Sequence, residues 1–106
     1  MFDVLKKLFG FGTAVDFEQL LSDGAIIIDV RTKGEFQGGH IKGSLNIPLD
    51  AITSQLSKLD KEKTIITCCA SGMRSAKAKL VLEANGYTEI YNGGSWTGLQ
   101  NKMNQQ

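Results

Sequence analysis

The most constraining feature of the sequence is a nearly continuous apolar run, Ala25-Ile26-Ile27-Ile28-Asp29-Val30. A strand that faces water on one side alternates apolar and polar residues, whereas a strand covered on both sides is apolar along its length. We therefore predict that residues 25–30 form a central strand with helices packed on both of its faces.

The rest of the chain alternates strand-like and helix-like segments, which is typical of an α/β fold with a mainly parallel sheet. Short runs suited to strands and amphipathic runs suited to helices follow one another, without repeats or long linkers. The expected further strands are 44–47, 64–67 and 89–91, and the expected helices are 16–21, 50–59, 76–84 and 96–103. We predict one domain over residues 13–106, preceded by a short segment at 1–12.

Three of the expected helices carry specific predictions. Asp16 is the expected N-cap of the first, with Gln19 at the capping-box position and Phe17, Leu20 and Leu21 on the buried face. Ser22-Asp23-Gly24 is expected to end that helix. Asp50 is the expected cap of a helix of about three turns that buries Ile52, Leu56 and Leu59.

The third of these helices precedes Asn85-Gly86, which supplies its stop signal. Ala76, Leu80 and Ala84 recur every fourth residue, with Val81 adjacent, and we expect them to form the buried face. Further along the chain, Gly93-Gly94 is expected to be a turn between the last strand and the terminal helix.

Composition limits the classes of function that the chain can serve. The sequence of 106 residues is 42% hydrophobic and 22% charged, with a net charge of +1. These values suit an ordinary soluble domain and give no case for a nucleic-acid partner. No apolar run approaches the roughly 20 residues of a membrane span. The two cysteines are neighbours and we expect free thiols, a cytoplasmic location and a monomer.

The first twelve residues are a separate question. Phe2, Leu5, Leu8 and Phe9 could share one helical face, and the segment lacks the pattern of a secretory signal. We predict a short helix that packs on the domain, with a surface or membrane contact element as the alternative.

Residues 68–75, Cys-Cys-Ala-Ser-Gly-Met-Arg-Ser, lie directly between a strand-like run and a helix-like run. A small-residue loop in that position gathers several backbone N–H groups, and the helix dipole adds about half a positive charge. Such a site holds anions and stabilises a thiolate over a thiol. The sequence therefore predicts a cysteine nucleophile in an anion-binding loop.

Several spaced motifs resemble the single-domain rhodaneses, a sulfurtransferase family, over about residues 13–99. They are Asp29-Val30-Arg31, Glu35-Phe36, Gly39-His40-Ile41-Lys42-Gly43-Ser44, Asn46-Ile47-Pro48, Cys69-x-x-Gly72-x-Arg74-Ser75 and Asn92-Gly93-Gly94. The resemblance implies a five-stranded, mainly parallel sheet flanked by helices. It also implies that a cysteine takes a sulfane sulfur as a persulfide and passes it to an acceptor.

By position, Cys69 is the nucleophile that the resemblance implies. The anion-binding loop around it comprises Ala70, Ser71, Gly72, Met73, Arg74 and Ser75. The implied donors are thiosulfate or another persulfide, and the implied acceptors are cyanide, a thiol or a protein cysteine. No metal or organic cofactor is implied. Arg74 either lines the anion site or holds the loop by a charged hydrogen bond.

The residues leave open two alternatives to an enzyme that transfers sulfur from a small donor. The first is a non-catalytic module that relays sulfur between protein partners. The second is a cysteine-dependent phosphatase or arsenate reductase, because five residues separate Cys68 from Arg74, as in phosphatase loops. Only four residues separate Cys69 from Arg74, and this shorter loop suits a sulfur-sized group better than a phosphate ester.

Other polar residues are expected to be structural. Strand alternation turns Cys68 away from Cys69, so Cys68 is expected in the core. His40 is the only histidine, and we predict a structural hydrogen bond for it and no zinc site. Asp29, Arg31 and Glu35 are expected to support the loops around the site, with Arg31 and Glu35 as a local ion pair.

Overall fold

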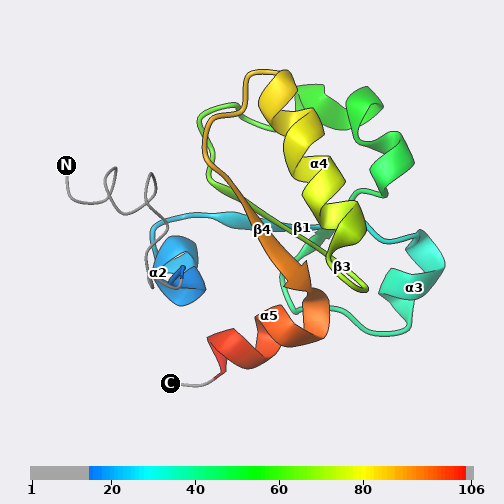
Figure 1. Ribbon diagram of the computed structural model, residues 1–106, viewed down its shortest axis with the longest axis vertical. Coiled ribbons are helices and arrows are strands. Elements are labelled where there is room, and N and C mark those ends of the chain that lie inside the picture. The colour runs from blue at the N-terminus through cyan, green and yellow to red at the C-terminus, as the bar shows by residue number, and fades with distance from the viewer. Residues whose placement is uncertain (1–14, 105–106) are drawn as a thin grey trace.

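The fold is a parallel four-stranded sheet between two layers of helices. In the computed structural model, which describes residues 15–104, the strand order is β2-β1-β3-β4 and every neighbouring pair is parallel. The strands are β1 (Ile26–Asp29), β2 (Leu45–Asn46), β3 (Ile65–Cys69) and β4 (Ile90–Ser95). The predicted α/β class is therefore confirmed, with β1 and β3 at the centre of the sheet (Figure 1).

The expectation of five strands is wrong for residues 15–104, where the sheet has four. The residue pattern itself contained only four strand-like runs, and the fifth came from the resemblance. One edge of the sheet, β2, is two residues long. Pro48 follows closely and has no N–H to donate to a ladder, which favours an early end to this edge strand.

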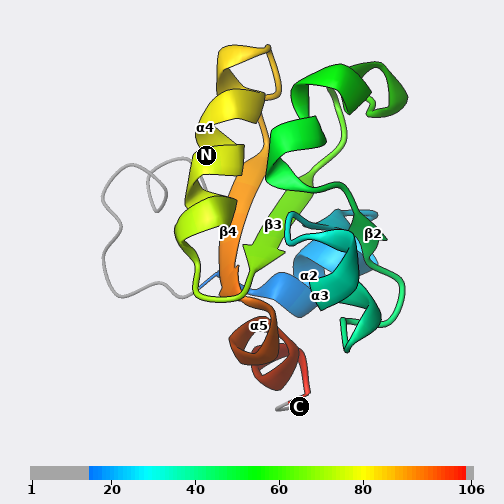
Figure 2. The ribbon, with the colours of Figure 1, turned by 90° about the vertical axis from the view of Figure 1, so that its right-hand side faces the viewer.

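Helices cover both faces of the sheet. The α-helices are α2 (Phe17–Ser22), α3 (Lys33–Gln37), α4 (Met73–Ala84) and α5 (Trp96–Met103), and the 3₁₀ helices are η1 (Leu49–Ala51) and η2 (Thr53–Lys58). Figures 1 and 2 show α4 and the 3₁₀ segments on one face and α2 and α5 on the other.

Each face of the sheet has its own buried apolar cluster. The cluster on the α4 side is built around Ile28, Ile65 and Leu82, and the cluster on the α5 side around Ile27, Ile66 and Leu99. Neighbouring residues of one strand thus enter different cores, as the period-2 geometry of a strand requires. This two-sided burial explains the apolar sequence of β1.

Several predicted helix ends are confirmed. Asp16 caps α2, because its carboxylate accepts a hydrogen bond of 3.0 Å from the Gln19 N–H. Only half of the capping box forms, since the Gln19 side chain donates instead to Asp23. Gly24 and Gly86 follow α2 and α4 with positive φ, and the Trp96–Met103 helix has its predicted bounds. The predicted segment at 1–12 lies outside the described residues.

The helix predicted over residues 50–59 is not α-helical. Two short 3₁₀ segments, η1 and η2, replace it, and Asp50 lies inside η1 instead of capping a helix. Within this segment the Ser54 hydroxyl donates to the Ala51 carbonyl, a local hydrogen bond that competes with regular helix. Ile52 is nevertheless fully buried and Leu59 nearly so, as predicted.

The helix predicted after the cysteine loop is present, but its predicted buried face is wrong. Leu80 is 66% exposed and Ala84 is exposed, whereas Ser75, Ala78 and Leu82 are buried. Counting every fourth residue selected Leu80 and Ala84, which face water, although Val81 does pack against the core. The stripe against the sheet was not selected because two of its three buried residues are small.

The last strand extends beyond its predicted end. Asn92, Gly93 and Gly94 belong to β4, which continues to Ser95 and leads directly into α5. The predicted Gly93-Gly94 turn is therefore wrong. Gly93 instead allows β4 to lie against β3, because an added Cβ would stand 2.9 Å from the Thr67 carbonyl oxygen.

Among residues 15–104, no helix is both long and apolar enough to cross a membrane.

Candidate active site

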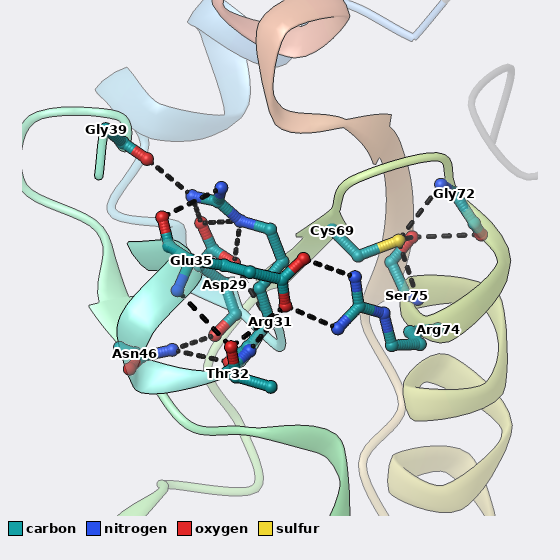
Figure 3. A network of polar contacts seen from close by, with 10 residues as sticks. All are labelled: Asp29, Arg31, Thr32, Glu35, Gly39, Asn46, Cys69, Gly72, Arg74 and Ser75. Carbon is teal, nitrogen blue, oxygen red and sulfur yellow. Dashed lines mark hydrogen bonds and ion pairs between the residues drawn. The ribbon is translucent and has the colours of Figure 1, made fainter. Parts of the chain in front are cut away.

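The candidate site lies at the carboxyl ends of the two central strands. From β1 the chain proceeds to β2 on one side of the sheet, and β3 lies on the other side. In parallel α/β sheets, such a change of direction opens a crevice outside the strand ends, where ligands bind. Asp29 ends β1 and Cys69 ends β3, so the polar motifs noted in the sequence meet there (Figure 3).

Cys69 Sγ is held by the first turn of α4. The Gly72 N–H donates to Sγ at 2.9 Å and the Ser75 N–H donates at 3.3 Å (Figure 3). The first N–H groups of a helix have no partner within it, so these two are free to bind the sulfur. The positive end of the α4 dipole lies at the same place. The predicted gathering of N–H groups around the sulfur is thus present.

The pKa values of the two adjacent cysteines are shifted in opposite directions. Burial, together with the nearby Asp29 carboxylate, raises the pKa of Cys68 to about 12. Burial also acts to raise the pKa of Cys69, but the hydrogen bond with the Ser75 hydroxyl and those from the N–H groups of Ser75, Gly72 and Ser71 outweigh it. The net effect lowers the pKa of Cys69, and only Cys69 favours a thiolate.

The two cysteines also belong to different cores. Cys69 packs in the cluster on the α4 side, and Cys68 packs in the cluster on the α5 side. Both are fully buried and unbridged. The predicted opposite orientation of the two side chains is confirmed.

Two glycines of the loop and of β4, Gly72 and Gly94, adopt positive φ angles. Gly72 has φ +101°, a conformation that β-carbons resist, and an added Cβ would lie 3.5 Å from Gly94 Cα. Gly94 has φ +83°. The Cys69 loop and the end of β4 therefore pack backbone to backbone.

A polar contact between Ser75 and Asn92 joins the loop to β4. The Ser75 hydroxyl lies 2.6 Å from Asn92 Oδ1, 3.0 Å from the Gly72 carbonyl oxygen and 3.4 Å from Cys69 Sγ. Asn92 Nδ2 donates to the Gly72 carbonyl at 3.4 Å, and the Gly94 N–H donates to Asn92 Oδ1 at 2.9 Å. The sequence reading quoted Asn92 only as part of a motif and missed this role.

Arg74 holds the loop by a charged pair. Its guanidinium donates to both carboxylate oxygens of Glu35, at 2.7 and 2.9 Å (Figure 3). The Arg74 hydrogen bond is the main cause that lowers the pKa of Glu35 to about 2. Of the two roles considered for Arg74, the structure therefore shows the second. The predicted Arg31–Glu35 ion pair is wrong, because each side chain has a different partner.

Arg31 forms a buried ion pair with Asp29. Arg31 Nη2 lies 2.7 Å from Asp29 Oδ2, and both side chains are buried. Arg31 also donates to the carbonyls of Glu35 and Gly39, and its guanidinium stacks 4.9 Å from the Trp96 ring centre. The predicted scaffold role of Asp29 and Arg31 is confirmed.

Helix α3, which is not among the helices expected from the sequence, places Glu35. Thr32 and Glu35 form a complete capping box, in which the Glu35 carboxylate accepts from the Thr32 N–H at 3.0 Å. The Thr-x-x-Glu spacing is the signal that could have predicted this helix. One carboxylate thus caps α3 and binds Arg74.

His40 contacts the backbone and the ring of Phe36. Its Nδ1 lies 2.7 Å from the Phe36 carbonyl oxygen, and its ring stacks on the Phe36 ring with 3.7 Å between centres. The structural hydrogen bond predicted for His40 is confirmed. Within residues 15–104, no group of three or more His, Cys, Asp or Glu side chains is placed to hold a metal ion.

The other loop residues differ in exposure. Ala70, Ser71 and Met73 are exposed, and Met73 is 80% exposed, whereas Cys69 is fully buried. A groove of about 410 Å³ flanks the loop on the side of Arg74 and Lys77. Its apolar walls include Val30 and Val81.

Comparisons with known proteins agree with these features. Residues 13–102 match the sequence pattern of the rhodanese-like domain family. The chain is 42% identical over 78 residues to YqhL of Bacillus subtilis, covering 70% of this chain and 62% of the relative. It is 36% identical over 69 residues to the thiosulfate sulfurtransferase PspE of Escherichia coli, covering 63% of this chain and 66% of the relative. The matches thus span just under two thirds of either relative.

A solved structure supports the same assignment. The human single-domain sulfurtransferase TSTD1 has a TM-score of 0.73 and 28% identity, over 81% of this chain and 90% of that one. Together with the sheet order and the cysteine loop, these likenesses show that the chain belongs to the rhodanese-like domain family.

Proposed function

We propose that this protein is a sulfurtransferase that carries a sulfane sulfur as a persulfide on Cys69. The observation that carries the proposal is the pair of N–H donors on Cys69 Sγ, from Gly72 at 2.9 Å and Ser75 at 3.3 Å. These donors favour the thiolate, which is the nucleophilic form of cysteine. The similarity to the sulfurtransferases PspE and TSTD1 supports the same reaction class.

With thiosulfate as donor, the first step is a displacement at its outer sulfur. The Cys69 thiolate forms a bond to that sulfur, the S–S bond of thiosulfate breaks, and sulfite leaves with the bonding electrons. The products are a Cys69 persulfide anion and sulfite, so the total charge is unchanged. No general base is needed, because the hydrogen bonds to Sγ already lower the pKa of the thiol.

The second step returns the enzyme to its starting form. Cyanide or a thiolate attacks the outer persulfide sulfur, and the Cys69 thiolate leaves. With cyanide, the product is thiocyanate. Sulfite, the persulfide and the thiolate are all anions, and N–H groups fixed by the helix end stabilise such charges without reorganising.

The loop favours sulfur transfer over phosphate chemistry. A phosphatase would use Cys68, whose pKa is raised to about 12 by burial and which packs in the core on the α5 side. Arg74 is also engaged by Glu35 and does not contact Cys69 Sγ. Neither residue is arranged to wrap and attack a phosphate ester.

Steady-state transfer of sulfur from thiosulfate to cyanide tests the proposal. The wild type and Cys68→Ala should form thiocyanate, and Cys69→Ser should fall to the uncatalysed rate, with circular dichroism showing that all three are folded. Turnover by Cys69→Ser would refute the assignment of the nucleophile. Absence of turnover in all three, together with sulfur loading from a protein persulfide, would instead indicate a relay between proteins.

A further inference from the structure

The Ser75 hydroxyl has one proton and three acceptors within reach. Asn92 Oδ1 is closest at 2.6 Å, followed by the Gly72 carbonyl oxygen at 3.0 Å and Cys69 Sγ at 3.4 Å. A hydroxyl donates one hydrogen bond at a time, although it can accept others. Asn92, the Gly72 carbonyl oxygen and the sulfur therefore compete for the same proton, with Asn92 the closest.

The orientation of the Asn92 amide is fixed by its neighbours. The Gly94 N–H points at one end of the amide at 2.9 Å, and only the oxygen can accept it. The other end lies 3.4 Å from the Gly72 carbonyl oxygen, which only the nitrogen can approach as a donor. Oδ1 consequently faces the Ser75 hydroxyl, and the contact of 2.6 Å requires that Ser75 donates to it.

A Ser75 hydroxyl that donates to Asn92 is compatible with the protonated form of Cys69. While the Ser75 proton points to Asn92, the Ser75 oxygen presents a lone pair to Sγ and accepts from the Cys69 S–H at 3.4 Å. When Cys69 loses its proton, the same lone pair faces a negative sulfur. The hydroxyl must then rotate so that its proton points to Sγ, while Asn92 Oδ1 keeps the Gly94 N–H.

We infer that Asn92 is a positioning residue that competes with Cys69 for the Ser75 hydroxyl proton and thereby sets how readily the nucleophile ionises. The inference rests on the proposed function, because it takes Cys69 as the nucleophile. Asn92 does not touch Sγ itself and acts through Ser75. The competition makes Asn92 stabilise the thiol relative to the thiolate.

The charged groups near Cys69 Sγ are already paired and do not take over the effect of Ser75 and Asn92 on the ionisation of Cys69. Arg74 is the nearest cation by sequence, but its guanidinium is bound to both oxygens of Glu35. On the facing strand β1, Asp29 is neutralised by Arg31. The adjacent thiol, Cys68, remains protonated because burial raises its pKa to about 12. The hydrogen bonds to Sγ from Ser75 and Gly72 therefore remain the main contacts that favour the thiolate against burial.

The test is the pKa of Cys69, obtained from the pH dependence of alkylation by iodoacetamide. Asn92→Ala removes the closest competing acceptor and leaves the longer contact to the Gly72 carbonyl oxygen, and we expect the pKa of Cys69 to fall by about 0.5 to 1 pH unit. Asn92→Asp strengthens the acceptor and adds charge, and should raise it by a similar amount. A residue that only held the loop in place would shift the pKa in the same direction in both variants.

A double-mutant cycle with Ser75→Ala isolates the proposed route. Without the hydroxyl, Asn92→Ala should no longer lower the pKa, and the increase caused by Asn92→Asp should become smaller, because only its charge still acts. Asn85→Ala is the matched control, since Asn85 Nδ2 donates to the Val81 carbonyl at the far end of α4. It should leave the pKa unchanged.

An unchanged or raised pKa in Asn92→Ala would overturn the inference, as would an equal decrease with and without Ser75. If Asn92→Ala does not fold, the two Asn92→Asp measurements still decide the question. Alkylation requires no sulfur transfer, so this result is independent of whether the proposed function holds.

Discussion

At the scale of single residues, the site depends on the fact that the side chains of Cys68 and Cys69, neighbours in β3, lie on opposite faces of the sheet. Cys68 enters the core on the α5 side, where burial raises its pKa to about 12. Cys69 faces the first turn of α4, where helix N–H groups lower its pKa despite burial. The chemical difference between the two residues thus comes from strand alternation and the helix end.

We expect this difference to appear as selective alkylation. Iodoacetamide at a pH of about 7 to 8 should modify Cys69 and leave Cys68 unmodified in the folded protein, because the thiolate is the reactive form and the pKa is lowered for Cys69 and raised to about 12 for Cys68. Peptide mass spectrometry after a timed quench identifies the labelled residue. Labelling in urea serves as the control, where both thiols should react. Equal labelling of Cys68 in the folded protein would contradict the assigned environments.

The Glu35–Arg74 pair should make stability depend on pH. The pKa of Glu35 is lowered to about 2 from 4.5, first by the Arg74 hydrogen bond and then by the Thr32 N–H. A carboxylate with a lowered folded-state pKa stabilises the fold above its unfolded pKa and loses this contribution as pH falls. The free energy of unfolding of the wild type should therefore approach that of Glu35→Gln as the pH falls from 4.5 to about 2.

Urea unfolding at a series of pH values measures this convergence. In an Arg74→Gln background, most of the pH-dependent difference that Glu35→Gln causes should disappear, because the main hydrogen bond to the carboxylate is gone. A difference that stays constant from a pH of about 6 to about 2 would show that Glu35 is not held as described.

The sequence predicted part of this residue-scale picture. Strand alternation placed Cys68 and Cys69 on opposite faces, and loop position predicted the N–H groups around Cys69. It did not pair Glu35 with Arg74, because those residues are 39 positions apart and meet only after α3 has formed. The Ser75–Asn92 contact joins residues 17 positions apart on different elements, and no local pattern signals it.

At the scale of elements, α4 shows why periodicity of apolar residues alone can select the wrong face. The stripe against the sheet contains Ser75, Ala78 and Leu82, of which only Leu82 is large and apolar. Thr67 donates from β3 to the Ser75 carbonyl at 2.9 Å, so a polar contact helps to dock the helix. Leu80 is left 66% exposed, and the helix bounds were predictable although the buried face was not.

Matched leucine truncations test the face of α4. Leu82→Ala should destabilise the protein by about 2–5 kcal/mol, because it removes a fully buried side chain and leaves a cavity. Leu80→Ala should change stability by about 0.5 kcal/mol or less, since the side chain is largely in water. Urea unfolding measures both. Comparable losses for the two variants would mean that α4 is rotated from its described position.

Matched glycine substitutions test the contact between β3 and β4. A Cβ at Gly93 would lie 2.8 Å from Leu99 Cδ2 and 2.9 Å from the Thr67 carbonyl oxygen, so Gly93→Ala should destabilise by about 1–3 kcal/mol. A Cβ at Gly34 would meet nothing within 4 Å, and Gly34→Ala in α3 should be neutral or stabilise by up to about 1 kcal/mol. Equal effects in urea unfolding would argue against the close approach of the two strands.

At the scale of the whole molecule, the fold brings two connections and one strand together at the carboxyl ends of the central strands. The connection after β1 supplies Arg31 and Glu35, the connection after β3 supplies the Cys69 loop, and the end of β4 supplies Asn92. The α/β class and the four strands followed from the residue pattern, whereas α3 did not. The fifth strand was expected only from the family resemblance, because a resemblance predicts the common fold of a family and not the extent of each sheet edge.

The measurement that tests the central claim most directly is the intact mass of the folded protein after exposure to thiosulfate. The wild type and Cys68→Ala should each gain the mass of one sulfur atom and lose it again when cyanide is added. Cys69→Ser should gain nothing. A wild type that takes up no sulfur, or a Cys69→Ser variant that takes up as much as the wild type, would contradict the proposal that Cys69 carries the transferred sulfur.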